Sequence, residues 1–242
     1  MRILALSLLL PLAACNSGDS IDTRNAIPAS GSGSARTYAA ADFTAVDLRG
    51  PDDVDVRVGS AFSVRAEGDS ATLDRLVIAR DGGKLRIGRK TGFFHWGSSG
   101  KVKVFVTMPR ITAGALAGSG DLTIDRVDGS DFHGSLAGSG NMKIGRLAAE
   151  TSALSIAGSG SITVDGGDAA RFKASIAGSG DITAAKLAAR EASVDIAGSG
   201  SVKATVDGPA QVSIMGSGDV DLGAKAKCDV HKVGSGEVRC GG

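Results

Sequence analysis

The sequence predicts an all-β fold, a right-handed parallel β-solenoid with coils of about 20 residues and Gly-Ser-Gly corners. Three observations predict it. A glycine triplet recurs at a regular spacing, aliphatic and polar residues alternate on both sides of it, and 36 of the 242 residues are glycine while only 4% are aromatic. A core with so few large side chains must be thin, with small residues packed closely together.

The Gly-Ser-Gly triplet marks the corners of the predicted coils. The first five triplets are spaced by 20 residues and the last two by 18. Glycine adopts backbone angles that other residues avoid, so each triplet predicts a sharp turn. The triplets begin at Gly118, Gly138, Gly158, Gly178, Gly198, Gly216 and Gly234.

Aliphatic residues occupy every second position on either side of each corner. Around Gly158, for example, they are Leu154, Ile156, Ile162 and Val164. An alternation with period two indicates a half-buried strand. The period is too short for two strands and a packed helix, so the unit should be strand, corner, strand, loop. Equivalent strands of successive coils should then pair in parallel, and parallel crossovers are nearly always right-handed.

The region before the triplets is less regular but also alternates. We expect strands over 43–48, 54–58, 62–66, 84–87 and 102–106, and either a helical turn or a strand over 73–79. These strands should form irregular, wider coils over 37–110 that cap the regular repeats of 111–242. Because no linker separates the two parts, residues 37–242 are predicted to form a single domain.

The N-terminus carries an export signal. Residues 1–14 hold one positive charge and an apolar run too short to span a membrane as a helix, which predicts a cleaved signal peptide. The sequence Leu12-Ala13-Ala14-Cys15 resembles the lipobox of bacterial lipoproteins, which implies acylation of Cys15. The alternative is an ordinary signal peptide with an incidental cysteine. Residues 15–36 should be a flexible tether, and Asn16, rather than Asp, favours the outer membrane.

Several segments, taken in order, resemble the putative autotransporter adhesin, head GIN domain family. The resemblance covers residues 37–240 and implies a parallel β-solenoid exported to the cell envelope, with adhesion suggested by the family's name. No binding residue is carried over from it. The segments are Phe43-x-x-Val46, Val54-Asp55-Val56 after Gly50-Pro51, Ser63-Val64-Arg65-Ala66-Glu67-Gly68-Asp69, Gly83-Lys84-Leu85-Arg86-Ile87, Val102-Lys103-Val104-Phe105-Val106-Thr107-Met108-Pro109 and the Gly-Ser-Gly-Asp corners.

No catalytic, cofactor or metal site is predicted. The three histidines, His95, His133 and His231, lie in no recognisable motif and are read as surface residues. Acidic residues recur after several corners, and Asp219 with Glu237 could hold a weakly bound calcium ion. The alternative, which we favour, is that these side chains bond to nearby backbone groups. A net charge of +1 without a basic stripe argues against a nucleic-acid partner.

Cys228 and Cys240 remain once Cys15 is acylated, and two cysteines in an exported protein predict a disulfide. Both occupy inward positions, six residues before and after Gly234. Facing sheets lie about 10 Å apart, whereas a disulfide needs Cα atoms about 5.5 Å apart. The end of the rod must therefore taper.

Phe93, Phe94 and Trp96 form the only aromatic cluster, between Gly92 and Gly97. They are predicted either to form a loop tip that contacts a partner or to plug the open end of the core; we favour the plug.

The predicted function is that of a non-enzymatic, membrane-anchored envelope protein, an adhesin-like or scaffold binding module. Its partner would be an unknown protein or a glycan, and it could form a homo-oligomer. One alternative is an envelope sensor or regulatory partner protein. A second is a polysaccharide-active enzyme, which rests only on analogy with other solenoids.

Overall fold

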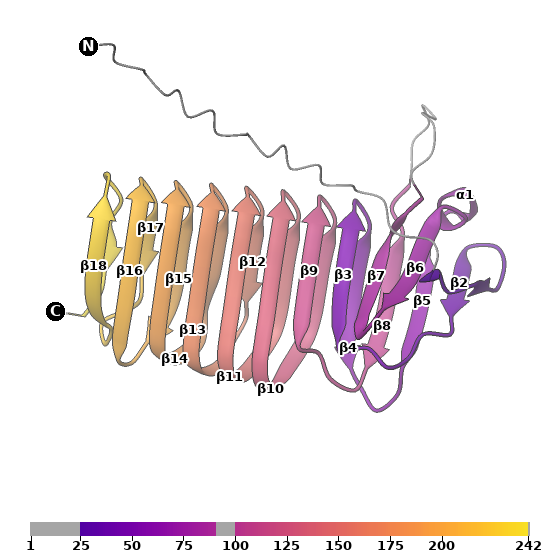
Figure 1. Ribbon diagram of the computed structural model, residues 1–242, viewed down its shortest axis with the longest axis horizontal. Helices are drawn as coiled ribbons and strands as arrows, with labels where there is room; N and C mark the ends of the chain where they lie inside the picture. Colours follow the sequence, from indigo (N-terminus) through magenta and orange to yellow (C-terminus); the bar gives the residue numbers. More distant parts are fainter. Residues whose placement is uncertain (1–24, 91–99, 242) are drawn as a thin grey trace, which may run out of the picture.

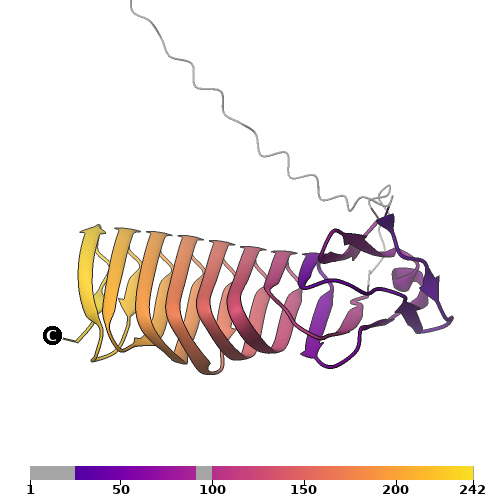
Figure 2. The same cartoon turned by 60° about the horizontal axis from the view of Figure 1, so that its bottom comes forward.

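The computed structural model describes residues 25–90 and 100–241, and in this part of the chain stacked β-coils form an elongated body (Figure 1). The strands form one 19-stranded sheet, and successive coils follow one another along the long axis (Figure 2). The predicted all-β solenoid with a spacing of about 20 residues is confirmed.

The N-terminal part contains eight strands and one short helix, α1 (Ser70–Leu73). The strands are β1 (Ala29–Ser30), β2 (Ala35–Tyr38), β3 (Ala45–Gly50), β4 (Asp53–Val58), β5 (Ser63–Glu67), β6 (Leu76–Asp81), β7 (Lys84–Arg89) and β8 (Lys103–Met108).

The regular coils that follow contain longer strands. They are β9 (Ala113–Gly118), β10 (Asp121–Gly138), β11 (Asn141–Gly158), β12 (Ser161–Val164), β13 (Gly167–Gly178), β14 (Asp181–Gly198), β15 (Ser201–Val206), β16 (Pro209–Gly216), β17 (Asp219–Asp221), β18 (Lys227–Val233) and β19 (Val238–Arg239).

Each regular coil has three sides rather than two strands and a loop. Between Asp121 and Gly138, every residue of β10 except Asp125 and Ser130 pairs in parallel with the residue 20 positions further on, in β11. The sides of this coil are 121–124, 126–129 and 131–138. The segment expected to be a loop is therefore hydrogen-bonded strand, because the equivalent segment of the next coil satisfies its backbone groups.

The predicted aliphatic rows fill one continuous core that runs along the coils. Residues two positions before and four positions after the first corner glycine are at most 3% exposed in the regular coils, as in Ile156, Ile162 and Ile176. The row four positions before the first corner glycine ends at the surface in the last coil, where Val230 is 41% exposed. Its partner Val212 is buried because a further coil, that of β18, covers it.

The corner glycines stack on one another with no room for a side chain. A Cβ on Gly138, whose φ is +121°, would lie 2.5 Å from the carbonyl oxygen of Gly118. A Cβ on Gly140 would lie 2.1 Å from the carbonyl oxygen of Gly120. Both glycines of the triplet are thus required, the first by its backbone angle as well as by contact.

An additional corner precedes the seven triplets and has a different sequence, Gly50-Pro51-Asp52. Gly50 pairs with Gly118, and its carbonyl oxygen accepts hydrogen bonds from the N–H groups of Ser119 and Gly120. The first corner of the stack was not predicted, because Asp52 takes the place of the second glycine.

The N-terminal region differs from the expected run of wider coils. Strands β3 and β4 do form a coil, which lies between the β7–β8 pair and the β9–β10 pair. However, β5 pairs antiparallel with β8, and β6 pairs antiparallel with β7. The two-residue turn Gly82-Gly83, with Gly82 at φ +57°, favours the β6–β7 hairpin. Segment 73–79 holds both expected elements, the end of α1 and the start of β6.

The expected flexible tether over 15–36 is wrong for residues 25–36. Ala26 bridges to Ala79, the N–H of Ile27 donates to the carbonyl of Ile78, and β1 pairs antiparallel with β2. This segment runs antiparallel beside β6, whose Val77 and Ala79 side chains are buried. Apolar burial offsets the ordering of a segment whose composition looked linker-like.

Candidate functional site

The residues predicted to meet a membrane or a partner lie outside the described part of the chain. They are Cys15, with the signal peptide over 1–14, and the aromatic residues Phe93, Phe94 and Trp96, with the neighbouring His95. The aromatic segment falls between β7 and β8, which flank the coil of β3 and β4 in parallel.

A long groove of about 750 Å³ runs along the outside of the third side of the solenoid. Two columns of small side chains form its floor, and they extend over six coils, about 24 Å at the usual strand spacing. Asp47, Arg49 and Lys84 lie at one end, and Met215, which is 64% exposed, lies at the other. The columns are Ala115, Ser135, Ser155, Ser175, Asp195 and Ser213, and Ala117, Ala137, Ala157, Ala177, Ala197 and Met215.

The groove follows from the sequence repeat. Residues of the third side alternate between core and surface, so the serine and alanine columns face outward on either side of the buried row that contains Ile156. Because these outward side chains are small, they leave a shallow groove that can accommodate an extended chain. The sequence pattern of aliphatic rows located the buried face, but its outward positions indicated only polar or small residues, so the groove was not predicted.

The acidic corner row has a structural role. Asp121 Oδ1 accepts from the backbone N–H of Asn141, Asp181 Oδ1 from that of Ser201, and Asp219 Oδ1 from that of Glu237. Each carboxylate therefore binds the backbone of the next coil, as favoured from the sequence. Among residues 25–90 and 100–241, no group of three or more histidine, cysteine or acidic side chains is arranged to hold a metal ion.

Asp52 and Arg89 form a buried ion pair that the sequence did not indicate. The Asp52 side chain is fully buried, and its Oδ2 accepts from Arg89 Nε at 2.8 Å. Its Oδ1 also accepts from the N–H of Val102, and Arg89 donates to the carbonyl oxygen of Gly100. Hydrogen bonding to Asp52 raises the pKa of Arg89, although burial opposes this. The pair thus joins the first corner to both sides of segment 91–99.

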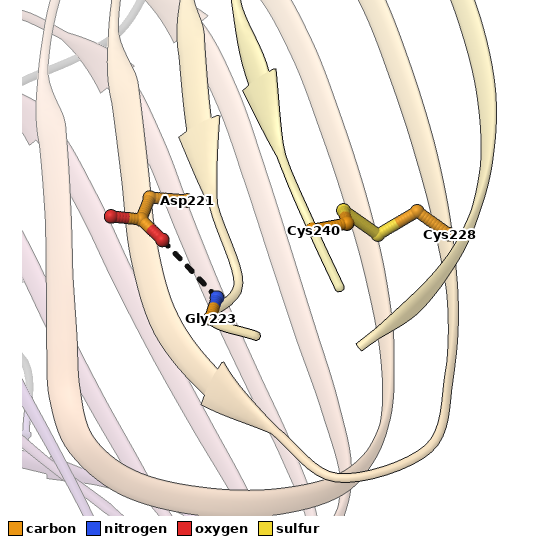
Figure 3. Close-up of a disulfide and its surroundings, with 4 residues drawn as sticks. All are labelled: Asp221, Gly223, Cys228 and Cys240. Carbon is orange, nitrogen blue, oxygen red and sulfur yellow. Dashed lines mark hydrogen bonds between the residues drawn. A yellow bond between two sulfur atoms is a disulfide. The ribbon is translucent and has the colours of Figure 1, made fainter. Parts of the chain in front are cut away.

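The C-terminal coil carries the predicted disulfide. Cys228 and Cys240 are bonded with their Cα atoms 6.2 Å apart, so β18 and β19 converge as the expected taper required (Figure 3). In the preceding coil, Asp221 Oδ1 accepts from the N–H of Gly223 and holds the turn that leads into β18 (Figure 3).

Lys232 occupies an inward position of this last coil. It pairs in register with Ile214, whose row is aliphatic in every preceding coil, and its Nζ donates to the carbonyl oxygen of Gly236 at 2.6 Å. An inward-pointing charge is a known way to protect the edge of a sheet from further pairing. Although Lys232 is exposed, its place in this row puts a charge at the open side of the last coil, where it would disfavour further strand pairing.

The remaining histidines are surface residues. His133 is exposed, and the exposed His231 lies 3.8 Å from Asp229. Where the chain is described, no helix has the length and apolar character needed to cross a membrane.

The stacked coils and glycine corners define a parallel β-solenoid protein. The family model for the putative auto-transporter adhesin, head GIN domain, matches residues 42–226, and the chain belongs to this family. No curated protein matches the chain significantly.

Solved structures share the fold at low sequence identity. A putative adhesin from Bacteroides fragilis is 18% identical, with a TM-score of 0.79, covering 85% of this chain and 95% of that chain. A putative lipid binding protein from Parabacteroides distasonis is 22% identical, with a TM-score of 0.73 and the same coverage. A putative adhesin from Parabacteroides merdae is 20% identical, with a TM-score of 0.68, covering 86% of this chain and 95% of that chain.

Proposed function

We propose that the chain is a lipid-anchored protein of the cell envelope that acts without catalysis, as an adhesin-like binding module. The observation that carries this proposal is the groove over six coils, whose floor of small side chains suits an extended glycan or peptide segment. Membership of a family described as an adhesin head supports the same role. The partner would lie along the third side of the solenoid.

The anchor would hold the N-terminal end close to an outer membrane. Nine residues separate Cys15 from Asn25, where the described body begins, and they span at most about 30 Å. The C-terminal coil lies at the opposite end of the body (Figure 1). In this arrangement the groove would extend away from the membrane.

The anchor is tested by metabolic labelling with palmitate in a bacterial host. We expect the native chain to incorporate the label and to fractionate with membranes, and Cys15→Ser to lose both properties. A Cys15→Ser chain that remains labelled would refute acylation at this residue.

The binding role is tested with the full chain on a glycan array and on immobilised peptides. Ala157→Arg places a long charged side chain in the middle of the groove and should abolish binding. Ala188→Arg makes the same change on the second side of the solenoid, also at an exposed alanine in a parallel strand, and should leave binding intact. Equal binding by the native chain and Ala157→Arg would exclude the groove.

A further inference from the structure

A second cavity lies at the N-terminal end, remote from the groove. Its volume is about 310 Å³, within the usual range for small-molecule sites. It lies between the segment 26–29, which bridges antiparallel to β6, and the elements α1, β2 and β6. Its walls include the apolar side chains of Ile27, Pro28, Leu73 and Leu76.

Tyr38 supplies a polar group without a partner among the described residues. It contributes to the cavity wall and is only 6% exposed, and residues 25–90 and 100–241 offer its buried hydroxyl no hydrogen-bond partner. A buried hydroxyl left without a partner costs about 1–3 kcal/mol. A ligand that accepts a hydrogen bond from this hydroxyl would remove that cost.

The charges around Tyr38 favour an anionic group. Arg36, whose side chain is 11% exposed, lines the cavity and donates to Asp74 Oδ1 at 2.9 Å. Lys90 lines it too, so two cations face one carboxylate. Burial raises the pKa of the Tyr38 hydroxyl, while Arg36 lowers it and Asp74 raises it. The hydroxyl therefore remains a hydrogen-bond donor near these charged groups at neutral pH.

We propose that this cavity binds a fatty acyl chain, with the methylene tail against Ile27 and Leu76 and a carboxylate or carbonyl oxygen accepting from Tyr38. An apolar wall, an unpartnered hydroxyl on a lining residue and a local excess of positive charge together suit an acidic amphiphile. The acyl chain has two sources, a free fatty acid or the acyl group on the protein's own N-terminus. The site is independent of the glycan or peptide groove.

The experiment is a calorimetric titration of the full chain carrying Cys15→Ser with laurate. We expect saturable binding of one laurate per chain, weakened about tenfold by Tyr38→Phe, which removes only the hydroxyl. Dodecylamine, which has the same tail and a cationic head, should bind more weakly than laurate. Tyr38→Phe should not lower the melting temperature, because the hydroxyl it removes has no partner.

Two tryptophan variants locate the site. Ala29→Trp fills the cavity from an exposed position of β1 and should abolish laurate binding. Ala137→Trp adds the same side chain at an exposed position of the distant solenoid and should not affect it. Absence of saturable binding, or binding that Ala29→Trp leaves unchanged, would overturn the proposal.

The source of the acyl chain is tested with the acylated protein in lipid nanodiscs. A laurate response weaker than that of Cys15→Ser would assign the cavity to the protein's own acyl group. An equal response would assign it to free fatty acids. Loss of acylation in the labelling experiment would refute the anchor but leave the laurate titration as an independent test of the cavity.

Discussion

At the second glycine of each triplet, the neighbouring coil leaves no room for a methyl group. The ideal Cβ position on Gly160 is 2.2 Å from the carbonyl oxygen of Gly140, and that on Gly200 is 2.1 Å from the carbonyl oxygen of Gly180. The clashing atoms belong to the backbone of the next coil, which cannot rotate away. The triplet is therefore a requirement of stacking, and the serine between the glycines is free to vary.

We expect Gly140→Ala to lower the free energy of unfolding by about 2–3 kcal/mol, because the added methyl group must separate two coils. Ser139→Ala, in the same corner, should change it by less than about 0.5 kcal/mol, since Ser139 is exposed. Urea denaturation followed by circular dichroism measures both values. Similar losses for the two variants would show that the corner tolerates a Cβ.

A buried serine interrupts the core between two phenylalanines. Ser152 is fully buried, and its neighbours in register are Phe132 and Phe172. Its hydroxyl has no hydrogen-bond partner in the described part of the chain. Both rings are fully buried. The small side chain leaves space for the rings above and below, at the cost of an unsatisfied hydroxyl.

Replacing this serine with alanine should therefore stabilise the protein. We expect Ser152→Ala to raise the free energy of unfolding by about 1 kcal/mol, because the cavity volume changes little and the buried hydroxyl is removed. Ser175→Ala, on the outer face of β13, serves as the control and should be neutral. Destabilisation by Ser152→Ala in the urea transition would indicate that the hydroxyl has a partner, such as an ordered water.

At the scale of elements, the N-terminal corner depends on one ion pair in place of a glycine contact. Asp52 occupies the position of the second corner glycine and binds Arg89 at the end of β7 and the N–H of Val102 before β8. A charge buried without its partner is strongly destabilising. The pair therefore couples the coil of β3 and β4 to that of β7 and β8.

Asp52→Asn should lower the free energy of unfolding by about 3–5 kcal/mol, because Arg89 would lose its counter-charge in a buried position. Asp53→Asn is the matched control. Asp53 forms an ion pair with Lys101, whose side chain is 59% exposed. Loss of this ion pair should lower the free energy of unfolding by less than about 1 kcal/mol. Chemical denaturation compares the two. Equal effects would mean that Asp52 stabilises only as a hydrogen-bond acceptor.

The sequence predicted the elements whose residue pattern repeats. It did not predict the elements whose position depends on one particular contact. The glycine triplets and aliphatic rows located the regular coils, because stacking imposes the same chemistry on each one. The corner at Asp52 was missed because an ion pair substitutes for a glycine. The position of the β3–β4 coil between two later pairs depends on long-range pairing, such as that of Val46 with Leu85 and Gly114, which no local pattern records.

Lys232 takes the place of an aliphatic residue in the row that contains Ile214, at the open side of the last coil. Lys232→Ile would extend this row to an edge strand that, in the described chain, pairs only with β16. We expect this variant to associate end to end, because the charge that disfavours pairing is lost.

Lys227→Ile is the control. It makes the same change on the same strand, in register with the exposed Pro209, and this variant should remain monomeric. Light scattering after size-exclusion chromatography distinguishes the two, and a monomeric Lys232→Ile would show that other features protect the edge.

For the whole molecule, stability depends on how the two ends of the stack are closed. Each inner coil is covered by a neighbour on both sides, whereas the last coil contacts only one and exposes Val230 and Val233. The sequence predicted that the N-terminal region caps the repeats and allowed for a helical turn, but it did not predict the antiparallel strands of this cap. It also predicted the disulfide that closes the other end. Because repeat proteins lose terminal units first, the ends should govern local unfolding.

Reduction of the Cys228–Cys240 disulfide should release the last coil before any other. The bond closes a segment with a sequence separation of 12, which corresponds to about 3 kcal/mol in the chain-entropy model. We therefore expect Cys228→Ser with Cys240→Ser to accelerate amide hydrogen exchange in β18 and β19, while exchange in β11 and β13 remains slow. Met215→Ser, at an exposed position of the neighbouring β16, controls for substitution near this end. If exchange rises equally in all coils, the solenoid unfolds as one cooperative unit and the disulfide stabilises it globally.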